Sequence, residues 1–409
     1  MKTINRRAAR SRRRAGVLAG ASLPFGLVFS ATLVFLPLWA TQDLGLTAGQ
    51  WAGVLASRQV GVLLTMVALC LVAPRLGPRR LSCLAMAGAG IALGSMGVLG
   101  QTGLPVAIGV YGGMISAGFV GFSTLTQLVS QRRAGSANTL FRSVMSAGRL
   151  IGPPLATGVA GYLGGYRAVM LAGGVMLVGA AVVVSRYPLG RDTRPEPWLT
   201  TPRQELRRLV RVMVDPLRRR PLQAYIHATE LSRAIAIAAP GFVAIRYVQE
   251  LGGRDAAVGF AASAGSLAVL LVSVRIARLL DHGSLRWVSY GLLLLCGLAL
   301  TAAGLSDRPA VLFGALALCT LGMSLGGAPM SLWVGRVAGP LPLAGVFAHH
   351  KLMSAAYGAA VAAVIGLVER IVSLNHLLLV CGIAIAVTAL PVMLLREPTA
   401  EWGKARSVR

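Results

Sequence analysis

The stretch TQDLGLTAGQWAGVLA, residues 41–56, is echoed by VQELGGRDAAVGFAA at residues 248–262. Each stretch joins an amide, an acid, Leu and Gly, passes through a short polar turn, and re-enters an apolar segment at a Gly. The tripeptide MSA at 145–147 recurs at 353–355, at the same offset to within one residue. Matches in the same order at nearly one offset indicate an internal repeat. The sequence therefore predicts two halves of like construction.

The composition of the 409-residue chain is too apolar for a soluble domain. Hydrophobic residues make up 55% of it and charged residues 13%, and the mean hydropathy is +0.70. Apolar runs recur from end to end, and about 20 apolar residues in a helix cross a hydrocarbon core. We expect an all-α polytopic membrane protein with twelve transmembrane helices in two six-helix bundles. The expected spans are 16–40, 48–73, 81–100, 104–130, 139–164, 168–187, 222–249, 256–279, 286–305, 308–335, 342–368 and 373–395.

The net charge of +27 is concentrated in the segments between alternate spans. If the N-terminus is inside, thirty of the 40 basic residues lie in inner segments. Five are assigned to outer loops: Arg167, Arg246, Arg254, Arg308 and Arg370. The positive-inside rule then places both termini in the cytoplasm. The same distribution argues against nucleic acid as a partner. The apolar run Val17–Ala40 is too long for a signal peptide, so we interpret it as the first transmembrane helix.

The segment between the two sets of spans differs from the other connections. Residues 186–221 hold ten arginines, four acids and several prolines. We therefore divide the chain into an N-terminal bundle at 1–187, a basic cytoplasmic linker at 188–221 and a C-terminal bundle at 222–409. The spacing of apolar residues from 206 to 213 fits an amphipathic helix lying on anionic lipid. The alternative is a solvated linker that obeys the charge rule.

Several classes of function lack their motifs in this sequence. The five cysteines all lie in apolar spans without CxxC spacing, so neither a disulfide framework nor a metal site is expected. No GxxxxGK[ST] sequence is present, so ATP coupling within this chain is not indicated. No HExxH sequence is present, and the thirteen acids are too few for most other catalytic sites, which argues against an enzyme. We expect no cofactor, with the proton gradient as the energy source.

Local motifs make the chain similar to the major facilitator superfamily of secondary transporters, over nearly its whole length. Residues 70–80 read CLVAPRLGPRR and resemble the family's basic loop between spans two and three, and residues 277–283 resemble its second copy. Residues 148–154 (GRLIGPP) resemble the family's Gly-Pro signature in span five. The resemblance implies two bundles that rock about a central site, with spans one, four, seven and ten lining the cavity.

Ten residues are candidates for gating or conformational roles, either through these motifs or as charges inside spans. In the resembled family the basic loop braces the closed inner gate. Arg58 either reaches the outer surface or forms an outer gate contact, and Arg149 either binds an anionic substrate or is a satisfied packing charge. Lys351 follows two adjacent histidines that cannot both face one metal, so an inner-gate role, or a position set by the positive-inside rule, is the better interpretation. The candidates are Arg58, Arg75, Gly77, Arg79, Arg142, Arg149, Gly152, Pro153, Asp281 and Lys351.

Glu230 is the one acid of thirteen that lies well inside a span. Charges in the bilayer core are costly and therefore mark functional candidates. His227 and Arg233 lie three residues before and after it, on neighbouring parts of one helix face. We predict that these three residues couple transport to protons. The alternative is a buried ion pair that ties two helices together.

The remaining cavity candidates are aromatic, Met and amide residues, which suit amphipathic or hydrophobic solutes. They are Phe25, Phe29, Phe119, Phe122, Gln127, Met323, Met330 and Trp333. We expect a monomeric transporter of a small amphipathic or hydrophobic solute, in contact with membrane lipid and most simply a proton-coupled exporter. Import of a metabolite or siderophore-like solute, and a transport-inactive receptor or assembly factor, are the alternatives. Only three lysines accompany many arginines, which suggests a GC-rich bacterial genome and hence the bacterial inner membrane.

Overall fold

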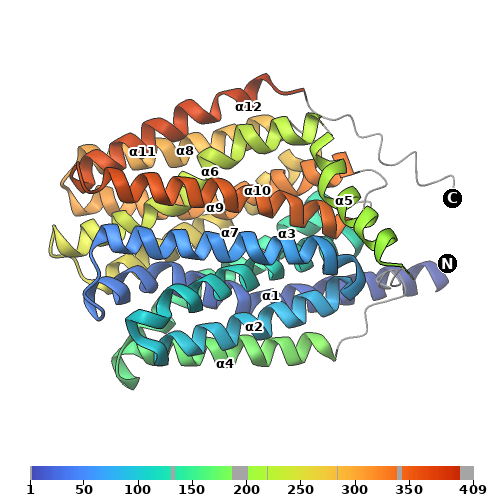
Figure 1. The fold of residues 1–409 in the computed structure, drawn as a ribbon, viewed down its shortest axis with the longest axis horizontal. Coiled ribbons are helices and arrows are strands. Elements are labelled where there is room, and N and C mark those ends of the chain that lie inside the picture. Colours follow the sequence, from blue (N-terminus) through green and yellow to red (C-terminus); the bar gives the residue numbers. More distant parts are fainter. Residues whose placement is uncertain are drawn as a thin grey trace.

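The computed structural model describes residues 2–129, 134–186, 201–218, 220–282, 284–338 and 343–396, and no strand occurs in these ranges. The helices run side by side as one elongated bundle (Figure 1). Their bounds are α1 (Lys2–Gln42), α2 (Ala48–Val129), α3 (Ala134–Leu163), α4 (Tyr166–Ser185), α5 (Pro202–Arg218), α6 (Arg220–Gln249), α7 (Asp255–His282), α8 (Leu285–Leu305), α9 (Pro309–Ala338), α10 (Leu343–Val368), α11 (Leu374–Ala389) and α12 (Pro391–Leu394).

The helix α2 contains three spans rather than one. A straight helix of its 82 residues would be about 120 Å long at 1.5 Å per residue. Instead it doubles back, so that its Gly61 and Gly109 lie in close contact: a Cβ added to Gly61 would lie 2.1 Å from the carbonyl oxygen of Gly109. Its three apolar segments are Ala48–Cys70, Arg75–Leu99 and Thr102–Leu125. Gly77 has a positive φ of 72° and lies at the turn between the first two segments. A positive φ favours glycine, which has no Cβ.

Eleven helical segments of the described chain are long and apolar enough to cross a membrane. The expected span at 139–164 is not among them, but α3 fills its place with 30 helical residues. Arg149, Pro153 and Pro154 lower the hydropathy of α3. With α3 the described chain has the twelve membrane-length segments that the sequence predicts, and the all-α fold is confirmed.

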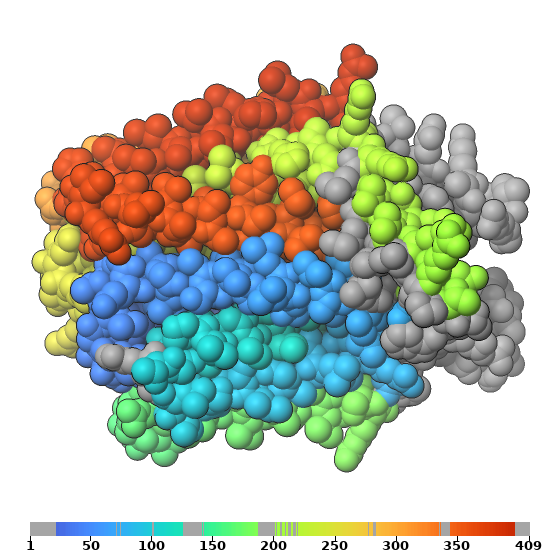
Figure 2. Space-filling model, in the orientation of Figure 1, coloured from blue at the N-terminus to red at the C-terminus, as the bar shows by residue number. Residues whose placement is uncertain are grey.

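The two halves of the chain lie against each other along their length. In Figure 1 the blue-to-green helices of the first half lie mostly below the yellow-green-to-red helices of the second half, and the two sets overlap where they meet. Helix α10 packs along α2, and α3 packs along α7, across the junction. Figure 2 shows the surface of α10 seated directly on that of α2. Any relative motion of the halves must therefore loosen these two long contacts.

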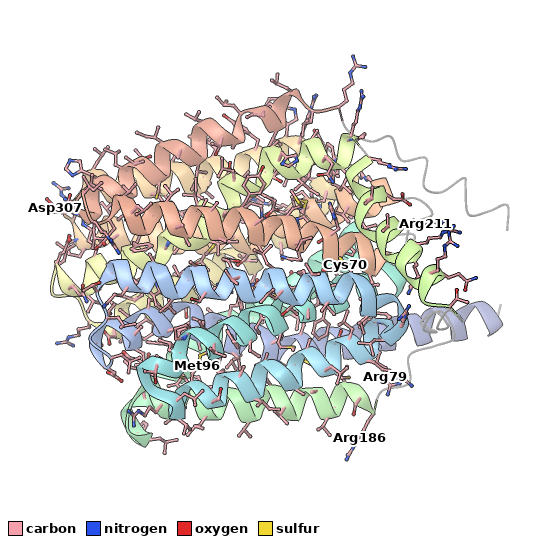
Figure 3. The ribbon with its side chains drawn as sticks, viewed as in Figure 1. Cys70, Arg79, Met96, Arg186, Arg211 and Asp307 are labelled. Atoms are coloured by element: carbon pink, nitrogen blue, oxygen red, sulfur yellow. The ribbon has the colours of Figure 1, made fainter. Side chains whose placement is uncertain are left out.

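The ends of the bundle differ in charge. Arg79, Arg186 and Arg211 lie at the end that also holds the start of α1 and the whole of α5, and Asp307 lies at the other (Figure 3). We call the first the basic end. Helix α5 forms within the predicted linker.

The opposite end holds the two repeated stretches, and we call it the corner end. Gly45 and Gly252, the glycines of the matching QDLG and QELG sequences, have φ of 66° and 65°. Leu44 N–H donates to the Trp39 carbonyl, and Leu251 N–H donates to the Arg246 carbonyl in the same way. A left-handed glycine is a common helix terminator. The two stretches therefore end their helices with the same backbone geometry.

Candidate functional site

A cavity of about 220 Å³ lies between the two halves. Helices α1, α2 and α3 line it from the first half, and α6, α7, α9 and α10 from the second. Most of its wall is apolar. Its ionisable side chains apart from tyrosine are Arg58, Arg149, Arg233, His350 and Lys351.

Four of the predicted substrate-contacting residues line this cavity. They are Phe29 and Phe119 from the first half and Met323 and Met330 from the second. The two aromatic rings meet edge to face at 5.6 Å between centroids. They supply the broad apolar surface that an amphipathic solute needs.

The other four lie behind the wall or outside the described side chains. Phe25 and Phe122 are fully buried, and both pack in the helix interface behind Phe119. Trp333 stacks on Tyr225 at 4.1 Å between centroids and donates to the Pro221 carbonyl at 3.3 Å. These aromatic residues support the wall. The side chain of Gln127 falls outside the described residues.

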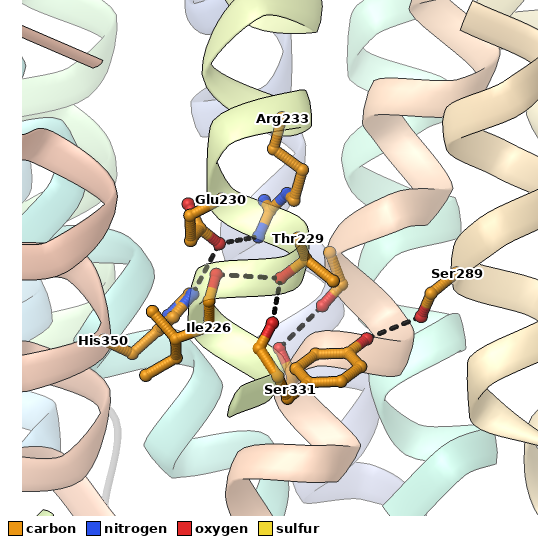
Figure 4. A network of polar contacts seen from close by, with 9 residues as sticks. Ile226, Thr229, Glu230, Arg233, Ser289, Ser331 and His350 are labelled. Carbon is orange, nitrogen blue, oxygen red and sulfur yellow. Dashed lines mark hydrogen bonds and ion pairs between the residues drawn. The ribbon is translucent and has the colours of Figure 1, made fainter. Parts of the chain in front are cut away.

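Glu230 is buried beside the cavity, one layer behind its wall, with 0% of its surface exposed. Its Oε1 accepts a hydrogen bond from Arg233 Nη1 at 2.8 Å and contacts His350 Nε2 at 2.9 Å (Figure 4). Glu230 and Arg233 lie on successive turns of α6, while His350 comes from α10. Arg233 and His350 themselves line the cavity. The carboxylate is therefore linked to the cavity wall through these two partners.

The structure brings Glu230 and Arg233 together as expected but places His227 elsewhere. His227 is exposed, and its Nδ1 lies 2.7 Å from the Tyr357 hydroxyl. His350 takes the position beside the carboxylate that was predicted for His227. A buried histidine needs a polar partner, so the histidines at 349 and 350 within an expected span were a signal for a partner of Glu230. Helical spacing alone could not choose between the two.

Two arginines reach the cavity from the first half. Arg149 on α3 is 7% exposed, and its Nη1 donates to Ser324 Oγ of α9 at 2.6 Å. Its guanidinium carbon also lies 4.8 Å from the centre of the Phe29 ring. Arg58 on α2 packs against Gly112, where an added Cβ would lie 2.5 Å from the Arg58 side chain. Lys351 lies with its Nζ 5.5 Å from the centre of the Phe119 ring.

The halves are joined at the corner end by one acid. Asp255, at the start of α7, accepts a hydrogen bond from Gln42 Nε2 at 3.1 Å and another from the Tyr166 hydroxyl. Gln42 and Tyr166 belong to the first half and Asp255 to the second, so these contacts close the junction. Partial burial raises the pKa of Asp43; the nearby Arg167 opposes this shift and Asp255 adds to it.

The remaining gating candidates lie at helix contacts rather than in the cavity. Arg79 donates to the carbonyl of Ser185 at the end of α4, and Arg75 is half-buried within α2. A Cβ on Gly152 would lie 2.4 Å from the Leu27 carbonyl oxygen, so α1 and α3 approach closely there. Pro153 touches α7 at Gly259, across the junction. The side chains of Arg142 and Asp281 lie outside the described residues.

Arg246 is a buried charge that the sequence placed in an outer loop. The structure corrects this: Arg246 lies in α6 and is 1% exposed. It pairs with Glu250 at 3.1 Å and with Asp307, and also donates to the Ala303 carbonyl. These contacts tie the corner end of α6 to the turn between α8 and α9. The residue is a structural brace of the second half.

In the part of the chain that the structure describes, twelve membrane-length helical segments form two halves with a cavity between them, an arrangement typical of secondary carriers. The chain belongs to the Major Facilitator Superfamily, whose profile matches residues 18–368. This confirms the resemblance and identifies a transporter. A search of curated protein sequences finds no match.

Two solved structures of transporters share this fold. The crystal structure of the human organic anion transporter MFSD10 (TETRAN) is similar with a TM-score of 0.69 and 15% identity, over 94% of this chain and 99% of that chain. The crystal structure of a POT family transporter in complex with a thioalcohol-conjugated peptide has a TM-score of 0.71 and 14% identity, over 93% of this chain and 96% of that chain.

Proposed function

We propose that this protein moves a small amphipathic solute across the bacterial inner membrane by alternating access, as a proton-coupled exporter. The observation that carries the proposal is the cavity between the halves, with Arg233 and His350, the partners of Glu230, in its wall. Solute carriers of like fold, among them an organic anion transporter, support it. A site between two halves becomes accessible from either side when the halves rock.

The proton is carried by the cluster of Glu230, Arg233 and His350. Its carboxylate is buried, and its partners Arg233 and His350 line the cavity, so protonation and solute binding act on the same side chains. A proton on Glu230 releases Arg233 and His350 from the ion pair. Their rearrangement alters the adjoining cavity wall. Such differential contact is what couples two binding events.

The test uses proteoliposomes with an imposed pH gradient and a panel of labelled candidate solutes. The wild type is expected to accumulate a solute against its gradient when the pH gradient favours it. Glu230→Gln is expected to abolish accumulation while leaving solute counterflow, which needs no proton, intact.

The matched control for this test is Glu250→Gln, which alters the partly exposed carboxylate that pairs with Arg246. It should leave both activities unchanged. Gradient-driven accumulation that survives in Glu230→Gln would contradict the coupling role. Failure of the wild type to move any solute would contradict transport itself.

A further inference from the structure

The described wall of the central cavity is lined by several cationic side chains and by no acid. Among its described lining residues are Arg58, Arg149, Arg233 and Lys351, and none is Asp or Glu. Glu230, behind the wall, pairs with Arg233. Arg58 and Arg149 form no ion pair with any described residue. The cavity therefore holds a surplus of cations in a place where charge is costly.

Among the described residues, Arg149 meets only neutral groups. Its described contacts are the Ser324 hydroxyl, the Met145 sulfur at 3.9 Å and the face of the Phe29 ring. Its Nε, and that of Arg58, are buried without a hydrogen-bond partner in the part of the chain that the structure describes. A buried charge without a counter-charge is strongly destabilising. An anion supplied from outside would provide a counter-charge and hydrogen-bond acceptors for both guanidinium groups.

We propose that the cavity takes an organic anion, a carboxylate attached to an apolar body, and that Arg58 and Arg149 bind the carboxylate. This specifies the substrate class of the transport function proposed above and rests on it. The planar fork of a guanidinium matches a carboxylate with two parallel hydrogen bonds. Two arginines on different helices, α2 and α3, allow the anion to be held from two directions.

The rest of the wall fits the apolar body. Phe29 and Phe119 present aromatic faces from the first half, and Met323 and Met330 present flexible side chains from the second. Met side chains adapt to ligands of different shape. An inorganic anion would leave this apolar surface without a partner. The two arginines select the charge, and the aromatic and Met residues select the apolar body.

The experiment compares probes that share one body and differ in charge. Purified protein in detergent is titrated with naphthalene, cyclohexane and phenylbutyl series, each as the carboxylate, the alcohol and the ammonium ion, and with sodium chloride. Thermal unfolding reports binding, because a ligand of the native state raises the apparent stability. We expect the carboxylate of at least one series to raise the unfolding temperature, and the alcohols, ammonium ions and chloride to have no comparable effect.

Variants assign the effect to the two arginines. Arg58→Gln and Arg149→Gln should each weaken apparent carboxylate affinity about ten- to hundred-fold, the usual range for losing a hydrogen bond to a charged group. The control Arg370→Gln alters an exposed arginine of the corner end and should change nothing. Arg58→Lys and Arg149→Lys keep the charge and should bind with intermediate affinity, which covers the case that a Gln variant fails to fold.

Each outcome is decisive for one of the two proposals. If alcohols, ammonium ions or chloride bind as well as carboxylates, or if both Gln variants bind carboxylate normally, the anion site is refuted while transport of another solute stands. If no series binds, the anion proposal fails. If carboxylates bind through both arginines but are not moved in proteoliposomes, the site is correct and the transport proposal fails.

Discussion

Asp255 gives the sharpest prediction about how the two halves separate. It accepts hydrogen bonds across the junction from Gln42 and Tyr166, and Asp255→Ala removes both. A hydrogen bond to a charged acceptor contributes about 1.5–3 kcal/mol when well shielded, and less when exposed. The Gln42 bond is exposed and the Tyr166 bond partly buried, so we take about 2 kcal/mol for the two together. That amounts to about a thirty-fold shift toward the state in which the corner end is open.

The assay is the distance between spin labels at Tyr162→Cys and Ile371→Cys. These positions belong to different halves at the corner end and are 92% and 84% exposed. The five native cysteines are free and lie mostly buried, so they compete little for the label. Asp255→Ala should move population toward longer distances.

The matched control is Asp307→Ala, which removes an ion pair to Arg246 within the second half. It should leave the distances between the halves unchanged. A distance distribution in Asp255→Ala that is identical to that of the wild type would refute the closing role of Asp255.

Three further predictions concern charge, packing and proton transfer. The pKa of Asp43 is raised in the folded protein, so its ionised form opposes folding: the stability it contributes is present at low pH and lost as the pH rises from 3.8 through the raised value. Asp43→Asn should therefore be slightly more stable than the wild type at neutral pH, by no more than about 0.5 kcal/mol in the free energy of unfolding, and should unfold at a slightly higher temperature. This advantage should vanish in acid, and an advantage that grows in acid would contradict the direction of the pKa shift. Gly61→Ala places a Cβ 2.1 Å from the Gly109 carbonyl oxygen and should cost about 1–3 kcal/mol, whereas Gly53→Ala meets no atom within 4 Å and should be neutral or slightly stabilising in the same thermal-unfolding assay. His350→Gln should slow gradient-driven accumulation in proteoliposomes while His349→Gln, whose ring contacts Gln223, should not; equal effects would exclude a special role for His350.

The fold could be predicted because its determinants are local. Apolar runs of membrane length and the alternation of arginines between segments gave the spans, and α3 appeared despite Arg149 and two prolines. The two repeated stretches end their helices at matching glycines, Gly45 and Gly252. These features depend on residues near one another in the chain.

The site was less predictable because it depends on contacts between distant helices. Helical spacing correctly joined Glu230 to Arg233 but could not show that His350 of α10, 120 residues away, completes the cluster. Helical position alone also could not separate Phe29, which faces the cavity, from Phe25, which lies one turn earlier and behind it. The depth of Arg246 was misjudged because its partner Asp307 lies in another turn.

Access to the central cavity from both sides of the membrane tests the account most directly. Ser116→Cys places a thiol of similar size in the cavity wall, and Ser82→Cys places one in a fully buried position that is not in the wall. In sealed vesicles of each orientation, a membrane-impermeant thiol reagent should modify Ser116→Cys from either side and Ser82→Cys from neither. Modification of Ser116→Cys from one side only, under every condition of pH and solute, would contradict alternating access.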